Sequence, residues 1–138
     1  RHKDYVSKKI VQAVCEIFHG KRKILYLGNI KSKIDWGYAK EYMEYSWKIM
    51  QRKKPDFYII GTGKNNTVEY FVKKCFEYVG LNYKKYIKVD KKLFRPSMTR
   101  NLLADIRKAK KELNFNPKTN LDSLIKIMMD DELRKYNG

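Results

Sequence analysis

Residues 57–80 read FYIIGTGKNNTVEYFVKKCFEYVG and contain three predicted elements in direct succession. Phe57–Ile60 is a short apolar run typical of a strand, and the turn Gly61–Gly63 ends it. From Val68 to Val79, apolar side chains recur every three or four residues, which predicts an amphipathic helix. A strand that turns through glycines into a helix is typical of α/β or α+β proteins.

Similar patterns extend over the rest of the chain. A helix is expected from Val6 to Phe18, where Gly20 follows the last apolar residue, and another from Ala39 to Met50. The remaining predicted elements are strands at 23–28 and 86–89, a helix that carries Ala109 and Leu113, and a helix at 121–133 after the Asn116-Pro117 break. Neither an internal repeat nor a linker interrupts this order, so residues 1–138 are expected to form one α/β portion, mostly helical with short strands.

Three polar residues stand where helix caps are expected. Asp35 precedes the second helix, and Asp105 precedes the helix with Ala109. Asn66 and Glu69 have the spacing of a capping box at the start of the third helix, with Asn in place of Ser or Thr.

Composition excludes several classes of protein. The chain has 138 residues, of which 43% are hydrophobic, so it is neither a disordered tail nor a low-complexity linker. No apolar run approaches the roughly 18–20 residues that span a bilayer, and the first residues lack a signal-peptide pattern. Cys15 and Cys75 fall on apolar helix faces and predict buried free thiols, while the isolated His2 and His19 give no metal site. We expect no membrane partner and a cytoplasmic location.

The net charge of +17 favours anionic partners, either nucleic acid or phosphorylated small molecules. The best nucleic-acid feature is residues 83–88, YKKYIK, in which aromatic rings could stack on bases while lysines meet phosphates. Lysines are nevertheless spread along the whole chain, which is typical of a lysine-rich composition. Nucleic acid is therefore the weaker hypothesis.

A dinucleotide site of its own is not expected in this chain. Gly61-Thr62-Gly63 is only a G-x-G, and the full glycine fingerprint that admits a pyrophosphate at a helix N-terminus is missing. Tyr-x-x-x-Lys occurs at Tyr5–Lys9 and Tyr70–Lys74, which is about the number of matches that chance gives in so tyrosine- and lysine-rich a chain.

Several segments together resemble the C-terminal part of the GDP-mannose 4,6-dehydratases, which belong to the extended short-chain dehydrogenase/reductases. The most specific of these are Asp35-Trp36-Gly37 and Phe94-Arg95-Pro96. The others are YVSKKI (5–10), LGNIKSKIDWGYAKEYM (27–43), FYIIGTG (57–63), TVEYFV (67–72), FEYVG (76–80), Ala104-Asp105 and KAKKELNFNP (108–117). Their order and spacing hold from Tyr5 to about Leu133.

The resemblance implies that the chain is the nucleotide-sugar-binding part of an NADP-dependent lyase. Such an enzyme converts GDP-mannose to GDP-4-keto-6-deoxymannose, a precursor of GDP-fucose, and would form a homo-oligomer at full length. In the family, the glycine-rich cofactor loop and the catalytic Tyr and Lys precede the region matched here. The chain is therefore expected to hold no catalytic residue and no NADP by itself.

The resemblance carries over five substrate-binding positions. Val6 and Lys9 match the start of a helix near the substrate, and Gly28-Asn29 match a turn against the nucleotide. Arg95 matches an arginine that grips phosphate, for which its planar fork of N–H donors is suited.

Other positions depart from the family pattern. Ile34 stands where the family has Arg, and an aliphatic side chain cannot hold a phosphate, a task for which Lys31 or Lys33 would have to substitute. The remaining departures are Met98 for Glu, Arg100 for Asp, Tyr38 for His and Ala104 for Gly. These changes leave open a divergent inactive relative, and a pure scaffold or oligomerisation role without GDP affinity is a further alternative.

Overall fold

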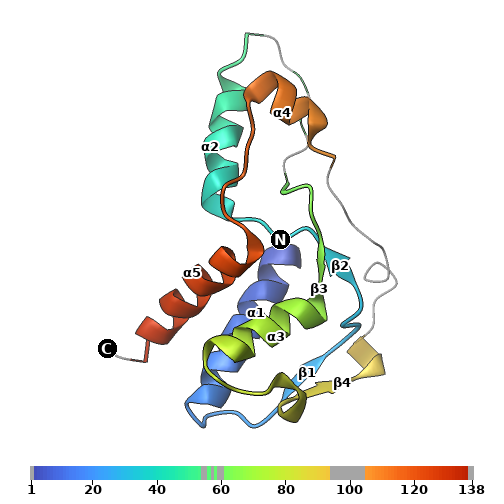
Figure 1. The fold of residues 1–138 in the computed structure, drawn as a ribbon, viewed down its shortest axis with the longest axis vertical. Coiled ribbons are helices and arrows are strands. Elements are labelled where there is room, and N and C mark those ends of the chain that lie inside the picture. Colours follow the sequence, from blue (N-terminus) through green and yellow to red (C-terminus); the bar gives the residue numbers. More distant parts are fainter. Residues whose placement is uncertain (1, 54–55, 57, 59–60, 94–104, 137–138) are drawn as a thin grey trace.

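The computed structural model describes residues 2–53, 56, 58, 61–93 and 105–136, with side chains from residue 6 onward. This part of the chain is mostly helical with short strands, which confirms the predicted fold class. Figure 1 shows an elongated molecule whose helices fall into two groups, one toward each end. Three helices gather near one end, α1 (His2–Phe18), α3 (Val68–Tyr78) and α5 (Leu121–Arg134), while α2 (Ala39–Met50) and α4 (Arg107–Leu113) lie at the other.

Helix α3 organises the main core because it contacts both α1 and α5. Its apolar face is buried as the sequence predicts, and Phe71 and Phe76 are wholly buried. Helix α1 contributes Ile10 and Val14, and α5 contributes Met129, each with no exposed surface. This single cluster also takes in Leu25 and Leu27 of the first strand.

Two small sheets lie beside this core. Strand β1 (Leu25–Leu27) pairs in parallel with β4 (Ile87–Val89), with Leu25 opposite Ile87. Strand β2 (Lys33–Ile34) pairs antiparallel with β3 (Asn66–Thr67). β1 and β4 confirm two predicted strands, whereas β2 and β3 are too short to give a periodic pattern. The predicted strand Phe57–Ile60 falls outside the described residues except for Tyr58. Two short 3-10 turns complete the described elements, η1 (Tyr83–Lys85) and η2 (Lys91–Leu93).

Two of the three predicted helix caps are wrong. The cap of α3 is Thr67, the last residue of β3, whose hydroxyl oxygen accepts from the Tyr70 amide at 3.0 Å. Helix α2 starts after Tyr38 without a side-chain cap, and Asp35 is used elsewhere.

The third cap, Asp105, is shifted by one residue from its predicted place. Ile106 is the N-cap of α4, yet the Asp105 carboxylate still accepts from the Arg107 amide at 3.2 Å. The preference of Asp for the start of a helix therefore holds, although it acts from one position further out.

Helices α2 and α4 form a second, smaller cluster. Tyr42, Tyr45 and Ile49 of α2 pack against the buried Ile106, Ala109, Leu113 and Phe115. The spacing of side chains in the sequence predicts a different packed stripe, through Ala39, Tyr42, Met43, Ser46, Trp47 and Met50. Only Tyr42 of that stripe reaches the cluster, and no residue of α2 is buried.

Cys15 and Cys75 are free and buried, as the sequence predicts. Burial raises the pKa of Cys15 to about 11, from an ordinary value of 9.0, and raises the pKa of Cys75 as well. Because the folded pKa of Cys15 is the higher one, its stabilising contribution is complete below about pH 9 and falls as the pH rises toward 11.

We therefore expect the folded chain to resist a thiol reagent near pH 8 and to release two reactive thiols after unfolding without reductant. The urea midpoint of unfolding should decrease as the pH rises from 9 to 11, and a Cys15→Ala variant should show a smaller decrease. Rapid labelling of the folded chain, or fewer than two thiols after unfolding, would contradict this expectation.

Candidate substrate site

The turn after β1 brings Gly28 against a distant segment of backbone. Because β1 and β4 are parallel, their carboxyl ends meet at one edge, where the Asp90 amide donates to the Leu27 carbonyl at 2.8 Å. A Cβ on Gly28 would lie 2.7 Å from the Leu93 carbonyl oxygen, a separation that side chains do not tolerate. Glycine is required here by the close approach of two backbones.

Asn29 shapes the same turn. Its side-chain oxygen accepts from the Lys31 amide at 3.0 Å, and its carbonyl accepts from the Ser32 amide at 3.4 Å. The structure thus joins Gly28 and Asn29 to Leu93, two residues before the predicted phosphate ligand in sequence. Arg95 itself lies outside the described residues, as do Met98, Arg100 and Ala104.

Val6 and Lys9 lie on a different element from this turn. Val6 is half-buried near the start of α1 and packs against the main core, whereas Lys9 is exposed, off the apolar face as predicted. The described substrate positions therefore fall at two places, the first turns of α1 and the carboxyl edge of β1.

The charged residues beside the turn include one of the two lysines that could substitute for an arginine at Ile34. Lys31 Nζ lies 3.0 Å from Glu69 Oε1, and the Tyr83 hydroxyl donates to Glu69 Oε2 at 3.1 Å. The hydrogen bonds from Lys31 and Tyr83 lower the pKa of Glu69 despite its partial burial. Both lysines that could substitute for an arginine at Ile34 are exposed, Lys31 within this ion pair and Lys33 on β2.

Asp35 is the polar residue that the sequence misassigned. It is 4% exposed, and it accepts from the Thr62 amide at 2.9 Å, the Thr62 hydroxyl at 2.5 Å and the Gly63 amide at 3.1 Å. The Gly61-Thr62-Gly63 turn therefore already gives its amides to a carboxylate. A phosphate cannot use the same donors, so this turn is not a cofactor loop.

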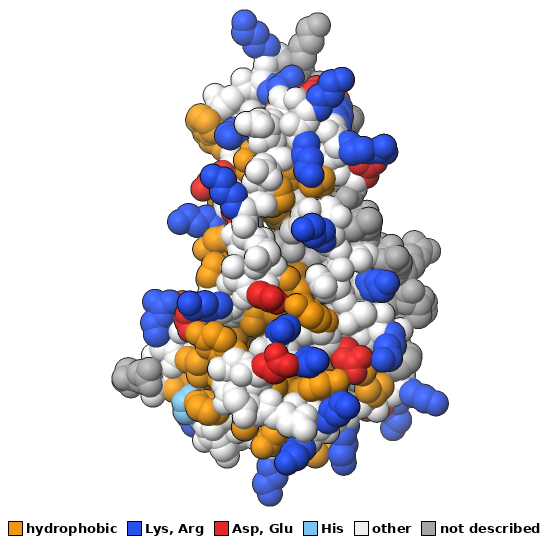
Figure 2. Space-filling model, in the orientation of Figure 1, with side chains coloured by type: hydrophobic (Ala, Val, Ile, Leu, Met, Phe, Trp, Pro, Cys, Tyr) orange, Lys and Arg blue, Asp and Glu red, His pale blue; other side chains and the backbone are white. Residues whose placement is uncertain are grey.

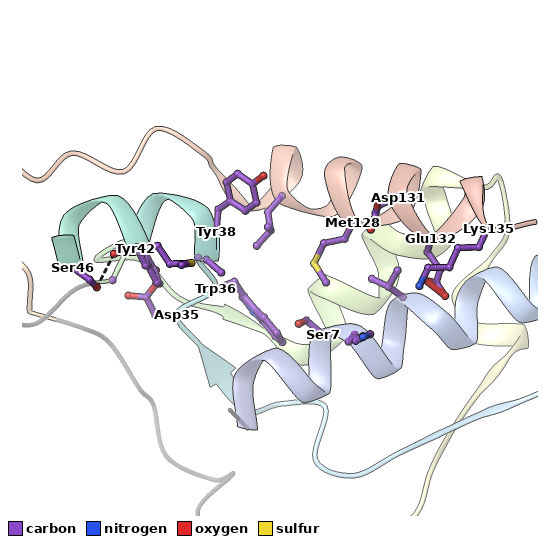
Figure 3. Close-up of a pocket in the computed structure, with 17 residues that line it drawn as sticks. Ser7, Asp35, Trp36, Tyr38, Tyr42, Ser46, Met128, Asp131, Glu132 and Lys135 are labelled. Carbon is purple, nitrogen blue, oxygen red and sulfur yellow. Dashed lines mark hydrogen bonds and ion pairs between the residues drawn. The ribbon is translucent and has the colours of Figure 1, made fainter.

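The residues after Asp35 line a hollow of about 610 Å³ between α1, α2 and α5 (Figure 3). The Trp36 ring stacks on Phe71 with a centroid separation of 4.4 Å, and its Nε1 donates to the Asn66 carbonyl at 3.4 Å. A Cβ on Gly37 would overlap the Tyr42 side chain. Asp35, Trp36 and Gly37 therefore all take part in the packing around this hollow. Its other labelled lining residues are Ser7, Tyr38, Ser46, Met128, Asp131, Glu132 and Lys135.

Tyr70 of the second Tyr-x-x-x-Lys match serves the fold, while the Tyr5 side chain of the first match lies outside the described residues. Burial and a 2.9 Å hydrogen bond to Asp122 raise the pKa of Tyr70, the opposite of what a proton-transferring tyrosine needs. In the YKKYIK segment, Tyr83 binds Glu69 and Tyr86 stacks on Phe76 at 5.6 Å, so both half-buried rings are committed to the protein. Figure 2 shows lysines and arginines scattered over the whole visible face, which is unlike a nucleic-acid track.

The described residues offer neither a metal site nor a membrane span. They contain no cluster of three or more His, Cys, Asp or Glu side chains that could hold a metal ion. Within the same residues, every helix is too short or too polar to cross a bilayer.

A family model described as GDP-mannose 4,6 dehydratase matches residues 1–128. GDP-mannose 4,6 dehydratase 1 of Arabidopsis thaliana is 41% identical over 133 residues, which are 96% of this chain and 37% of that protein. The human GDP-mannose 4,6 dehydratase is 33% identical over 156 residues, covering 99% of this chain and 42% of the relative. The chain thus spans about two fifths of the length of the curated relatives it matches.

Solved structures agree on the fold. An RMD from Pseudomonas aeruginosa, complexed with NADPH, superposes with a TM-score of 0.82 at 11% identity, covering 94% of this chain and 43% of the other. A dTDP-glucose 4,6-dehydratase from Bacillus anthracis, in complex with NAD, gives a TM-score of 0.72 at 17% identity, with 89% and 38% covered. The arrangement of elements is therefore one that about two fifths of each of these chains shares, which confirms the predicted fold class.

The role of Asp35 can be tested by substitution. Asp35→Ala leaves the Thr62 and Gly63 amides without their acceptor, so we expect it to lower the free energy of unfolding by about 1–3 kcal/mol. Asp35→Asn keeps one acceptor oxygen but turns an N–H group toward amide donors. Its free energy of unfolding should therefore lie between those of the unchanged chain and the Asp35→Ala variant. Urea denaturation followed by circular dichroism measures both, with Asp131→Asn on the exposed face of α5 as the matched control. Equal stability of the Asp35→Ala and Asp131→Asn variants would refute this role.

Proposed function

Because this chain belongs to the GDP-mannose 4,6-dehydratase family, we propose that residues 1–138 form the C-terminal, substrate-binding portion of a GDP-mannose 4,6-dehydratase. The parent enzyme would be an NADP-dependent lyase that converts GDP-mannose to GDP-4-keto-6-deoxymannose in the cytoplasm, on the route to GDP-fucose. It would act as a homo-oligomer. The observation that carries the proposal is the family match over residues 1–128.

The geometry of the β1 edge supports a role in binding the nucleotide. In open α/β folds, ligands bind beyond the carboxyl ends of parallel strands. Gly28 and Asn29 stand at that end of β1, where the Leu93 backbone lies directly against Gly28, and Arg95 follows Leu93 by two residues in the sequence. We propose that Gly28 and Asn29 face the nucleotide and that Arg95 binds its phosphates.

The first turns of α1 would complete the site. Lys9 is exposed there, and an ammonium on a flexible stem can approach a phosphate without displacing any packed group. Val6 is half-buried against the core beside it and would hold the helix in place. With Ile34 in place of an arginine, the pyrophosphate would depend on fewer cations, so the affinity would rest more heavily on Arg95.

The described residues do not fit NADP. Its pyrophosphate needs a glycine-rich turn with unused amides at a helix N-terminus, and the Gly61-Thr62-Gly63 amides are bound by Asp35. The cofactor supplies hydride transfer when it is bound to the parent enzyme, and we propose that the rest of the parent holds it. This portion binds and orients the nucleotide sugar and is inactive alone.

The purified 138-residue chain should retain no NADP and show no dehydratase activity, because it offers no pyrophosphate cradle of its own. Calorimetric titration with NADP, together with nucleotide extraction from the purified chain, measures this directly. The Pseudomonas RMD that was solved with NADPH is the positive control. Measurable NADP retention by this chain would contradict the proposed division of labour.

Arg95→Ala should weaken GDP binding by about 10- to 150-fold, because a charge-assisted hydrogen bond contributes roughly 1.5–3 kcal/mol. Arg95→Lys should recover only part of the affinity, since an ammonium lacks the planar fork. Pro96 favours an extended Arg95, which would help to aim the guanidinium. Calorimetry with GDP at fixed ionic strength gives the affinities.

The matched control for Arg95 is the pair Lys84 and Lys85, both exposed and belonging to η1. Changing both to Gln removes two charges but should alter GDP affinity only through long-range attraction, which salt screens. Equal losses in the Arg95→Ala variant and in this double variant would mean that GDP is held by diffuse charge alone.

A further inference from the structure

Helix α2 exposes three large apolar side chains on one face. Met43, Trp47 and Met50 are 73%, 62% and 79% exposed, and their spacing of four and three residues places them in a row. Tyr42, Tyr45 and Ile49, on the neighbouring face, hold α2 against α4. The row itself contributes to neither core cluster of the described residues.

The row continues into the hollow at the start of α2. Met43 lines that hollow together with Tyr38 and Tyr42, as do Leu124 and Met128 of α5. Figure 3 shows Tyr38, Tyr42 and Met128 among the lining side chains. We call the row and the apolar residues of the hollow together the α2 surface: Tyr38, Met43, Trp47, Met50, Leu124 and Met128. Hydrophobic side chains also reach the surface over α2 in Figure 2. Monomeric soluble proteins seldom expose a continuous apolar surface of this kind unless something covers it.

We infer that the α2 surface is the docking face for the cofactor-binding portion of the parent enzyme, an inference that rests on the proposed function. About three fifths of the length of the Arabidopsis and human relatives lies outside the matched region. A similar share of the two solved chains lies outside the superposed region. That additional portion must lie against the region equivalent to this chain. The α2 surface offers it a row of large apolar contacts and a recess beside them.

Charge argues against a second copy of this chain as the occupant. Each copy carries a net charge of +17, so bringing two of them together face to face is opposed by repulsion. A portion of different composition does not face this repulsion.

The test is hydroxyl-radical footprinting, because Met and Trp oxidise readily and mass spectrometry resolves each residue. One sample is the 138-residue chain alone. The other is a chimera in which this chain replaces the matched region of Arabidopsis GDP-mannose 4,6 dehydratase 1. We expect oxidation of Met43, Trp47 and Met50 to fall several-fold in the chimera. Phe18 and Tyr78, which are 47% and 40% exposed near the other end of the molecule, should keep their rates and are the controls.

Retention of NADP by the chimera reports separately that the cofactor-binding portion is folded. Unchanged oxidation of the α2 row in a chimera that holds NADP overturns the docking face while leaving the proposed function intact. If the chimera does not hold NADP, this chain and the cofactor-binding portion of the Arabidopsis relative are instead co-expressed as two separate chains. Co-purification should then be lost with the double variant Met43→Glu, Trp47→Glu and kept with Phe18→Glu; equal recovery of both variants overturns the inference.

Sedimentation of the chain alone across a wide concentration range covers the remaining alternative. A monomer at all concentrations is the expected result. A dimer that the Trp47→Glu change dissolves would make a second copy the occupant and overturn the assignment.

Discussion

The Asp35 carboxylate ties together the two segments on which both ends of the molecule depend. It sits directly after β2 and binds the backbone of the Thr62–Gly63 turn, shortly before β3. β2 and β3 can therefore pair, although each has only two residues. A carboxylate that is 4% exposed stays stable in this place because several donors converge on it.

Trp36 extends the same constraint into the core. Its ring stacks on Phe71 in the middle of α3, while its indole N–H reaches the Asn66 carbonyl in β3. Gly37 then admits the Tyr42 side chain, which anchors α2 to the outlying cluster around Phe115. A short run of three residues thus connects the main core, the small antiparallel sheet and the outlying helix pair.

The large positive charge and the fold are largely independent of each other. Most ion pairs of the described residues are exposed, and pairs of this kind contribute little to stability. The charge nevertheless affects the proposed site, since Lys9, Lys31 and Lys33 are all exposed near the substrate positions, with Lys31 paired to Glu69. An enzyme portion that binds a nucleotide diphosphate benefits from such a field through faster encounter, whichever residues make the final contacts.

The sequence by itself determined the helices with long apolar periods, the β1 and β4 strands and the family. Val68–Tyr78 could be predicted because its five buried residues repeat at helical spacing, and the carboxyl-edge turn at Gly28 because its motif belongs to the family pattern. Tertiary structure alone decided which face of α2 is packed, which residue caps α3, and what Asp35 binds. Apolar periodicity is a local property, whereas a cap, a buried carboxylate or an exposed row of Met and Trp depends on which distant segments arrive beside it. In α2, the packed side chains are Tyr45 and Ile49, because α4 and Phe115 lie against that side of the helix. Trp47, on another side, is left exposed.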